Sequence, residues 1–166
     1  MSDLDVVLQW CTALQATSVA TAIRETVLYP IIECSHVLGL ALSVGAIMWF
    51  DLRLLGLVWK KSSVSAAFSM VKPVMMVGFA VMILTGALLF TARASEAFSS
   101  VFFRIKIGLL VLSALNVALF HLTIDRRRRD WELADPPPAQ VRMAGLVSLA
   151  LWFSVIAAGR ITAYKL

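Results

Sequence analysis

The sequence predicts an all-α fold, a bundle of four transmembrane helices preceded by an amphipathic helix that lies along the membrane surface. Of the 166 residues, 60% are hydrophobic and only 15% are charged, and the charges concentrate between long apolar runs. Four of these runs are long enough to cross the roughly 30 Å hydrocarbon layer as helices. They are residues 31–51, 73–91, 103–124 and 141–159. We therefore divide the chain into an interfacial helix, 1–28, and a transmembrane bundle, 29–166.

Residues 4–26 are expected to form the amphipathic helix. Leu4, Leu8 and Cys11 recur at intervals of three and four, while polar residues such as Gln9 occupy the opposite side. A helix of this kind lies in the plane of the membrane, with Trp10 at the depth of the lipid headgroups. No basic segment precedes an apolar core here, so we expect no cleavable signal peptide.

Proline and charge mark the limits of the four spans. Pro30 ends the amphipathic helix and suits the first turn of the first span, and Pro73 is expected to open the second span. The segment 60–72 is basic and is interpreted as a short loop or a surface helix. The segment 125–138 combines four consecutive arginines with three consecutive prolines, which predicts a stiff, charged loop.

The distribution of lysine and arginine predicts the orientation in the membrane. Segments 51–72 and 125–142 carry most of the basic residues, including Arg126–Arg129. The positive-inside rule places these segments in the cytoplasm, so both termini are expected to be periplasmic. The net charge of +5 is accordingly ascribed to loops that face anionic lipid, and no nucleic-acid partner is expected.

Small residues and cysteines predict packing more than chemistry. Gly39 and Ser43 form a small-xxx-small pair, which lets helices approach closely where lipid offers no hydrophobic drive. Cys11 and Cys34 match no CxxC or zinc spacing. We interpret both as small packing residues, and a disulfide between them stays an open alternative if that side faces an oxidising compartment.

The candidate site residues are ionisable groups inside the spans, where charge is expensive unless it is partnered or functional. Glu33 and His36 lie one turn apart on a polar stripe of the first span that also includes Asp51. Lys106 and His121 share a face of the third span, and Arg160 ends the fourth. Glu33, His36, Lys106 and Arg160 are expected at one depth. Their functional interpretation is a cofactor or proton site, and the structural one is helix pairing.

His36 and His121, the two histidines of the chain, suggest b-type haem held by imidazoles. Their predicted depths differ by about 20 Å, too far for both to bind one iron. Each histidine would then be the metal ligand of its own haem, or His36 would contact the headgroup of a quinone. Copper bound by methionine, cysteine and histidine was a further candidate, but the methionines show no MxxM or MxM repeat.

Several motifs together resemble a catalogued family of small four-helix bacterial inner-membrane proteins of unassigned function. They are Tyr29-Pro30-Ile31-Ile32-Glu33 with His36 and Gly39, the run 51–56, Thr85-Gly86, Phe103 with Lys106, Trp152, and Ala158-Gly159-Arg160. The resemblance implies a location in the bacterial inner membrane. It also implies a role for Glu33, His36, Asp51, Arg53, Lys106 and Arg160. For Asp51 and Arg53 we favour a structural role, in which the two charges pair with other helix ends.

A looser resemblance joins the chain to copper-resistance D type and small cytochrome-b membrane proteins, which bind haem between helices. Our leading hypothesis is a membrane protein that binds b-type haem or a quinone and transfers electrons. The alternative is a non-catalytic anchor or assembly subunit of a larger membrane complex, or a homo-oligomer. A proton- or metal-coupled transporter is less favoured, because four spans provide little pathway. The sequence does not decide whether the protein is itself an enzyme.

Overall fold

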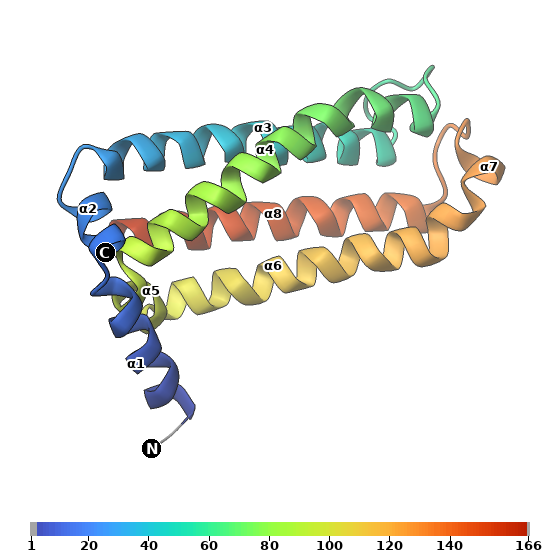
Figure 1. Ribbon diagram of the computed structural model, residues 1–166. Helices are drawn as coiled ribbons and strands as arrows, with labels where there is room; N and C mark the ends of the chain where they lie inside the picture. Colours follow the sequence, from blue (N-terminus) through green and yellow to red (C-terminus); the bar gives the residue numbers. More distant parts are fainter. Residues whose placement is uncertain (1–2, 166) are drawn as a thin grey trace.

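The computed structural model describes residues 3–165 and confirms the all-α fold class (Figure 1). Residues 1–2 and 166 of the predicted segments 1–28 and 29–166 lie outside the described part. Four long helices are each apolar enough to cross a membrane, so the protein is a membrane protein. They are α3 (Leu28–Leu54), α4 (Val64–Ala92), α6 (Val101–Leu119) and α8 (Ala139–Lys165).

The four long helices form two pairs. Helix α3 packs along α4, α6 packs along α8, and the pairs are joined mainly where α3 meets α8. Helices α4 and α6 approach each other closely at very few positions. The space between the two pairs therefore holds the cavities described below.

Glycines bring α3 and α4 into backbone contact. A Cβ atom on Gly78 would lie 2.4 Å from the Ser43 backbone nitrogen, and one on Gly39 would lie 2.9 Å from the Met82 nitrogen. Ser43 is fully buried, and its hydroxyl donates a hydrogen bond to the Gly39 carbonyl one turn earlier. The Gly39–Ser43 pair thus forms the close helix contact that its spacing predicted.

Helix α4 begins nine residues before the predicted start of the second span. Ser63 caps it by accepting a hydrogen bond from the Ala66 backbone N–H, and the helix then continues through Pro73. The prediction that Pro73 opens the span, with a loop or separate surface helix before it, was wrong. Proline removes only the hydrogen bond to the carbonyl four residues back, and this lies at the exposed Ser69.

The amino-terminal segment forms two short helices instead of the single predicted one. Helices α1 (Asp3–Gln15) and α2 (Ser18–Arg24) meet at a 70° bend, because Thr17 caps α2 and accepts from the Ala20 N–H. Helix α1 packs on the short helix α5 (Ala94–Ser99), where Gln15 Oε1 accepts bonds from the Ser95 N–H and hydroxyl. Helix α1 is therefore held by hydrogen bonds against α5, the segment that connects α4 to α6.

At the opposite end, α6 continues through a π-helical turn, η1 (Phe120–Ile124), and a 3-10 turn, η2 (Asp125–Arg127), into α7 (Arg128–Trp131). The buried Trp131 ring packs with Leu54, Val64, Phe120 and Val141, and its indole N–H donates to the Ile124 carbonyl. The predicted charged loop thus contains a helix anchored in the core.

Arg53 joins the segments at this end. Its side chain is only 1% exposed, and Nε and Nη2 donate to the Ser62 carbonyl at 3.2 and 2.8 Å. Nη2 also donates to the Glu132 carbonyl at 3.4 Å. The α3–α4 loop and the end of α7 are therefore held by one guanidinium, which agrees with the structural role favoured for this residue.

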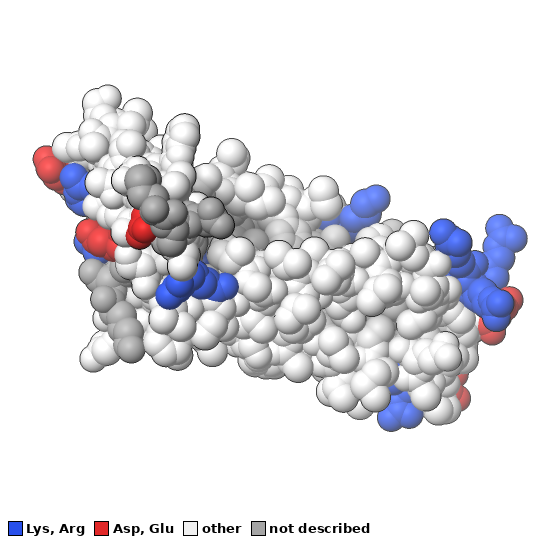
Figure 2. Space-filling model, turned by 90° about the horizontal axis from the view of Figure 1, so that it is seen from below, with Lys and Arg blue, Asp and Glu red and all other residues white. Residues whose placement is uncertain are grey.

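Charged side chains lie mostly toward the two ends of the molecule, as the face in Figure 2 shows. The predicted cytoplasmic segments meet at the α7 end, and the amino-terminal helices and α5 lie at the other end. Cys11 is buried, Cys34 is exposed, and both are free thiols in the structure.

Candidate functional site

The predicted residues Glu33, His36, Lys106 and Arg160 line one cavity at the end of the bundle that carries α5. We call it the α5-end cavity. Its volume is about 450 Å³, and its walls come from α3, α4, α5, α6 and α8. Glu33, His36 and Lys106 are half-buried, whereas Arg160 is exposed at the rim. Helices that are distant in sequence therefore bring the four ionisable groups together.

The imidazole of His36 is held against α4. Its Nδ1 lies 3.0 Å from the Thr85 hydroxyl oxygen, and that hydroxyl donates its own hydrogen to the Val81 carbonyl at 2.6 Å. When the hydroxyl donates to Val81, its oxygen can accept from Nδ1–H, and in that tautomer Nε2 of the neutral ring is the proton acceptor. Gly86 makes room for this arrangement, because a Cβ there would lie 3.1 Å from His36 Cε1.

Positive charge predominates over negative charge around this cavity. The end of the Lys106 side chain crosses α8 at Gly159, where a Cβ would lie 3.8 Å from Nζ. Arg93 also lines the cavity, with its guanidinium 5.1 Å from the centre of the Tyr29 ring and 3.6 Å from the Glu96 carboxylate. An occupant that presents hydrogen-bond acceptors or negative charge would suit these groups.

Two phenyl rings provide a flat apolar surface in the same cavity. Phe90 of α4 and Phe103 of α6 stack with their centroids 5.4 Å apart and their planes only 12° from parallel. Aromatic rings in this arrangement favour a further planar ring beside them. The α5-end cavity thus combines a flat aromatic wall with ionisable groups.

His121 does not join this group. It lies in the π-helical turn at the other end of the bundle, where its side chain is 45% exposed and Nδ1 lies 2.9 Å from Asp125 Oδ2. The two histidines line different cavities. Across residues 3–165, no cluster of three or more His, Cys, Asp or Glu side chains is placed to hold a metal ion.

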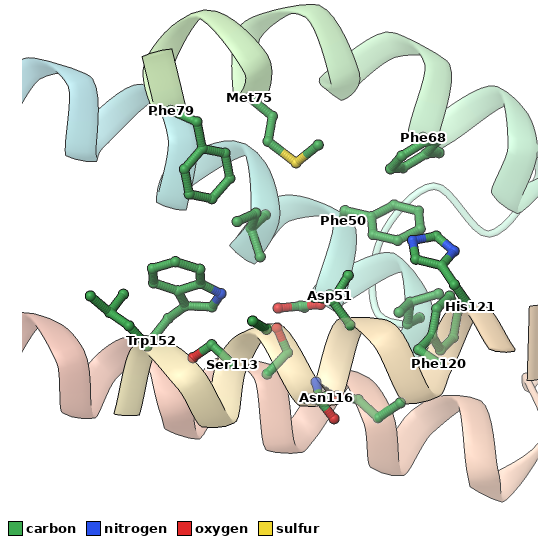
Figure 3. A pocket seen from close by; sticks show the side chains of 17 residues that line it. Phe50, Asp51, Phe68, Met75, Phe79, Ser113, Asn116, Phe120, His121 and Trp152 are labelled. Carbon is green, nitrogen blue, oxygen red and sulfur yellow. Dashed lines mark hydrogen bonds between the residues drawn. The ribbon is translucent and has the colours of Figure 1, made fainter. Parts of the chain in front are cut away.

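A second cavity of about 430 Å³ lies between the same helices near α7, and we call it the α7-end cavity. Aromatic rings dominate its walls, and Asp51 of α3 points into it (Figure 3). Asp51 is only 3% exposed, with Ser148 of α8 within hydrogen-bonding reach. Within the described residues, its Oδ2 has no hydrogen-bond partner. The expected pairing of Asp51 with other charged helix ends does not form for this oxygen.

Sequence reasoning missed the contact of Thr85 with His36 and the position of Asp51 in a cavity. Thr85 was recognised only as part of a motif, since its partner depends on how α4 is rotated against α3. For Asp51 the sequence did contain a signal, because a carboxylate within an apolar run is costly and indicates a partner or a function inside the bundle. Asn116, which also lines the α7-end cavity, gave no comparable signal.

The fold and these cavities define a small all-α membrane protein with ionisable groups gathered between its spans. Residues 16–165 match a family described as "Family of unknown function (DUF6644)", and the chain belongs to that family. No curated protein and no solved structure matches the chain. The match confirms the predicted membership of an uncharacterised family, whereas the looser resemblance to copper-resistance D and cytochrome-b proteins stays a prediction.

Proposed function

We propose that the α5-end cavity binds the headgroup of a membrane quinone and that the protein passes electrons between the quinone pool and a redox partner. The observation that carries the proposal is the convergence of Glu33, His36, Lys106 and Arg160 on one largely apolar cavity. A quinone headgroup is planar and apolar, with carbonyl oxygens that accept hydrogen bonds. The Phe90–Phe103 pair, the Lys106 ammonium and the imidazole suit these features.

The chemistry divides between protons and electrons. Reduction of a quinone to a quinol takes two electrons and two protons, and oxidation returns them. Lys106 Nζ donates a hydrogen bond to one oxygen and stabilises the charge that develops on it. His36, with Nε2 free to accept, and Glu33 take or return the protons. The electrons come from, or go to, the redox partner, a periplasmic or membrane protein.

Replacing Lys106 with methionine is expected to weaken binding of decylubiquinone at least tenfold. The change keeps most of the length of the unbranched side chain but removes the donor and the charge that would face the quinone oxygen. The measurement is equilibrium binding to the purified protein in lipid nanodiscs. Lys72→Met is the matched control, because Lys72 is exposed on α4 and does not line this cavity. Equal affinities of the two variants would contradict the proposal.

The haem form of the hypothesis places a b-type haem in the same cavity, where His36 would bind the iron. His36 is the one histidine among the described residues that line it, so any further ligand would have to be another group. Arg93, Lys106 and Arg160 would pair with the propionates. An absorption spectrum of protein expressed with ample haem distinguishes the haem hypothesis from the quinone hypothesis. A Soret band that is lost in His36→Gln would favour haem over the quinone.

We further propose that the protein resides in the bacterial inner membrane with both termini in the periplasm. The clustering of the basic segments 51–72 and 125–142 at the α7 end supports this orientation. The exposed apolar side chains of α1, Leu4 and Trp10 among them, suit the proposed interfacial position of that helix. Broad apolar surfaces on the four spans face lipid, or a second copy or another subunit in a complex.

A further inference from the structure

We propose that the α7-end cavity is a second binding site, which takes a lipophilic amine in its protonated form. The ammonium group pairs with the carboxylate of Asp51, and the apolar body contacts the aromatic walls (Figure 3). This site is separate from the proposed quinone site. The two cavities have different ionisable linings, and His36 and Lys106 belong only to the other one.

Asp51 supplies the first argument. A carboxylate that is 97% buried is costly unless its oxygens accept hydrogen bonds and its charge meets a cation. Ser148 accounts for part of this requirement, but Oδ2 has no partner within residues 3–165. An ammonium group provides both the missing donor and the opposite charge.

The rest of the lining supplies the second argument. Among the described residues around this cavity none is a lysine or arginine, and the one other ionisable side chain is His121 at the edge. Two guanidinium groups near this end of the bundle are already bonded elsewhere. Arg128 lies 5.9 Å from the centre of the Phe68 ring and pairs with Asp125, and Arg53 donates to the Ser62 and Glu132 carbonyls. Among the described side chains that line this cavity, none therefore takes the place of a bound cation.

The walls supply the third argument, because they suit the apolar body of such an amine. Phenylalanine and tryptophan contribute five residues to the cavity walls. The negative faces of such rings attract cations, and the rings also pack against apolar groups. They are Phe50, Phe68, Phe79, Phe120 and Trp152.

The cationic surroundings of the α5-end cavity, with Arg93, Lys106 and Arg160, would disfavour the same ligand.

The test compares 4-phenylbutylamine with its neutral counterpart 4-phenylbutan-1-ol. Tritiated amine is bound to the purified full-length protein in nanodiscs and measured by scintillation proximity, with the alcohol as a competitor. We expect saturable binding of the amine and at least tenfold weaker competition by the alcohol. This comparison uses only the unaltered protein, so it does not depend on the folding of any variant.

Asp51→Asn is expected to reduce amine affinity at least tenfold and to leave the affinity for the alcohol unchanged. Glu33→Gln, a matched loss of a carboxylate in the other cavity, is expected to bind the amine as the unaltered protein does. Amine and alcohol of equal affinity, an unaffected Asp51→Asn, or no saturable amine binding would each overturn the proposal. Decylubiquinone binding measured on the same samples reports on the quinone site separately.

Discussion

Replacing Gly78 with alanine is expected to lower the free energy of unfolding by about 3 kcal/mol, the upper part of the usual range for overpacking. The added Cβ would lie 2.4 Å from the Ser43 nitrogen and 2.9 Å from the Gly39 carbonyl oxygen. Both are backbone atoms of α3, so no side chain can rotate away. Helices α3 and α4 must separate, and the packing along their shared face is lost.

The effect is measured as a fall in the midpoint of thermal unfolding of the detergent-solubilised protein, followed by helical circular dichroism. A loss of 3 kcal/mol corresponds to about 6–12 °C for a chain of this size. Gly45→Ala and Gly108→Ala are matched controls, because a Cβ at either position meets nothing within 4 Å. If Gly78→Ala unfolded at the same temperature as these controls, the close approach of α3 and α4 would be wrong.

Replacing Arg53 with leucine is expected to destabilise the protein by about 2–4 kcal/mol, because hydrogen bonds from a charged donor are lost within the fold. The Ser62 carbonyl would lose both of its bonds from the guanidinium, and the Glu132 carbonyl would keep only the Val64 N–H at 3.3 Å. Leucine leaves no buried charge behind, so the loss reports on these contacts and on the packing of the longer side chain.

The location of the destabilisation in Arg53→Leu distinguishes it from a general loss of stability. Hydrogen exchange is expected to become faster in the loop 55–63 and around Glu132, and to change little at the α5 end. Arg142→Leu is the control, since it removes the same group from an exposed position of α8 at the same end of the bundle. Comparable stability of the two variants would show that Arg53 does not hold these segments together.

Helical periodicity and depth in the membrane were sufficient to predict four of the ionisable groups that share a cavity at the α5 end, but not Arg93. Glu33 and His36 lie one turn apart on one helix, and Lys106 and Arg160 lie at matching depth on two others. Side chains that are costly to expose to lipid turn toward the bundle interior. The convergence of these side chains could therefore be predicted without knowing the angles at which the helices cross.

Contacts that depend on the rotation of one helix against another could not be predicted in this way. The bond between His36 and Thr85 requires that α4 present that threonine at one point along α3. The prediction that Pro73 opens the second span failed for a different reason. Proline ends a helix only where the missing hydrogen bond cannot be tolerated. Asp51 lay close to the charged end of its span, which favoured pairing over a position in a cavity.

The scarcity of close contacts between α4 and α6 bears on how a ligand of the proposed kind would reach the α7-end cavity. Ala114 and Val117 of α6 line the α7-end cavity and are also exposed on the surface of a helix that is apolar enough to cross a membrane. Ligands would then arrive by lateral diffusion within the bilayer instead of from the aqueous phase. Occupancy would follow the mole fraction of the ligand in the lipid, and a strongly partitioning compound would fill a site of modest intrinsic affinity.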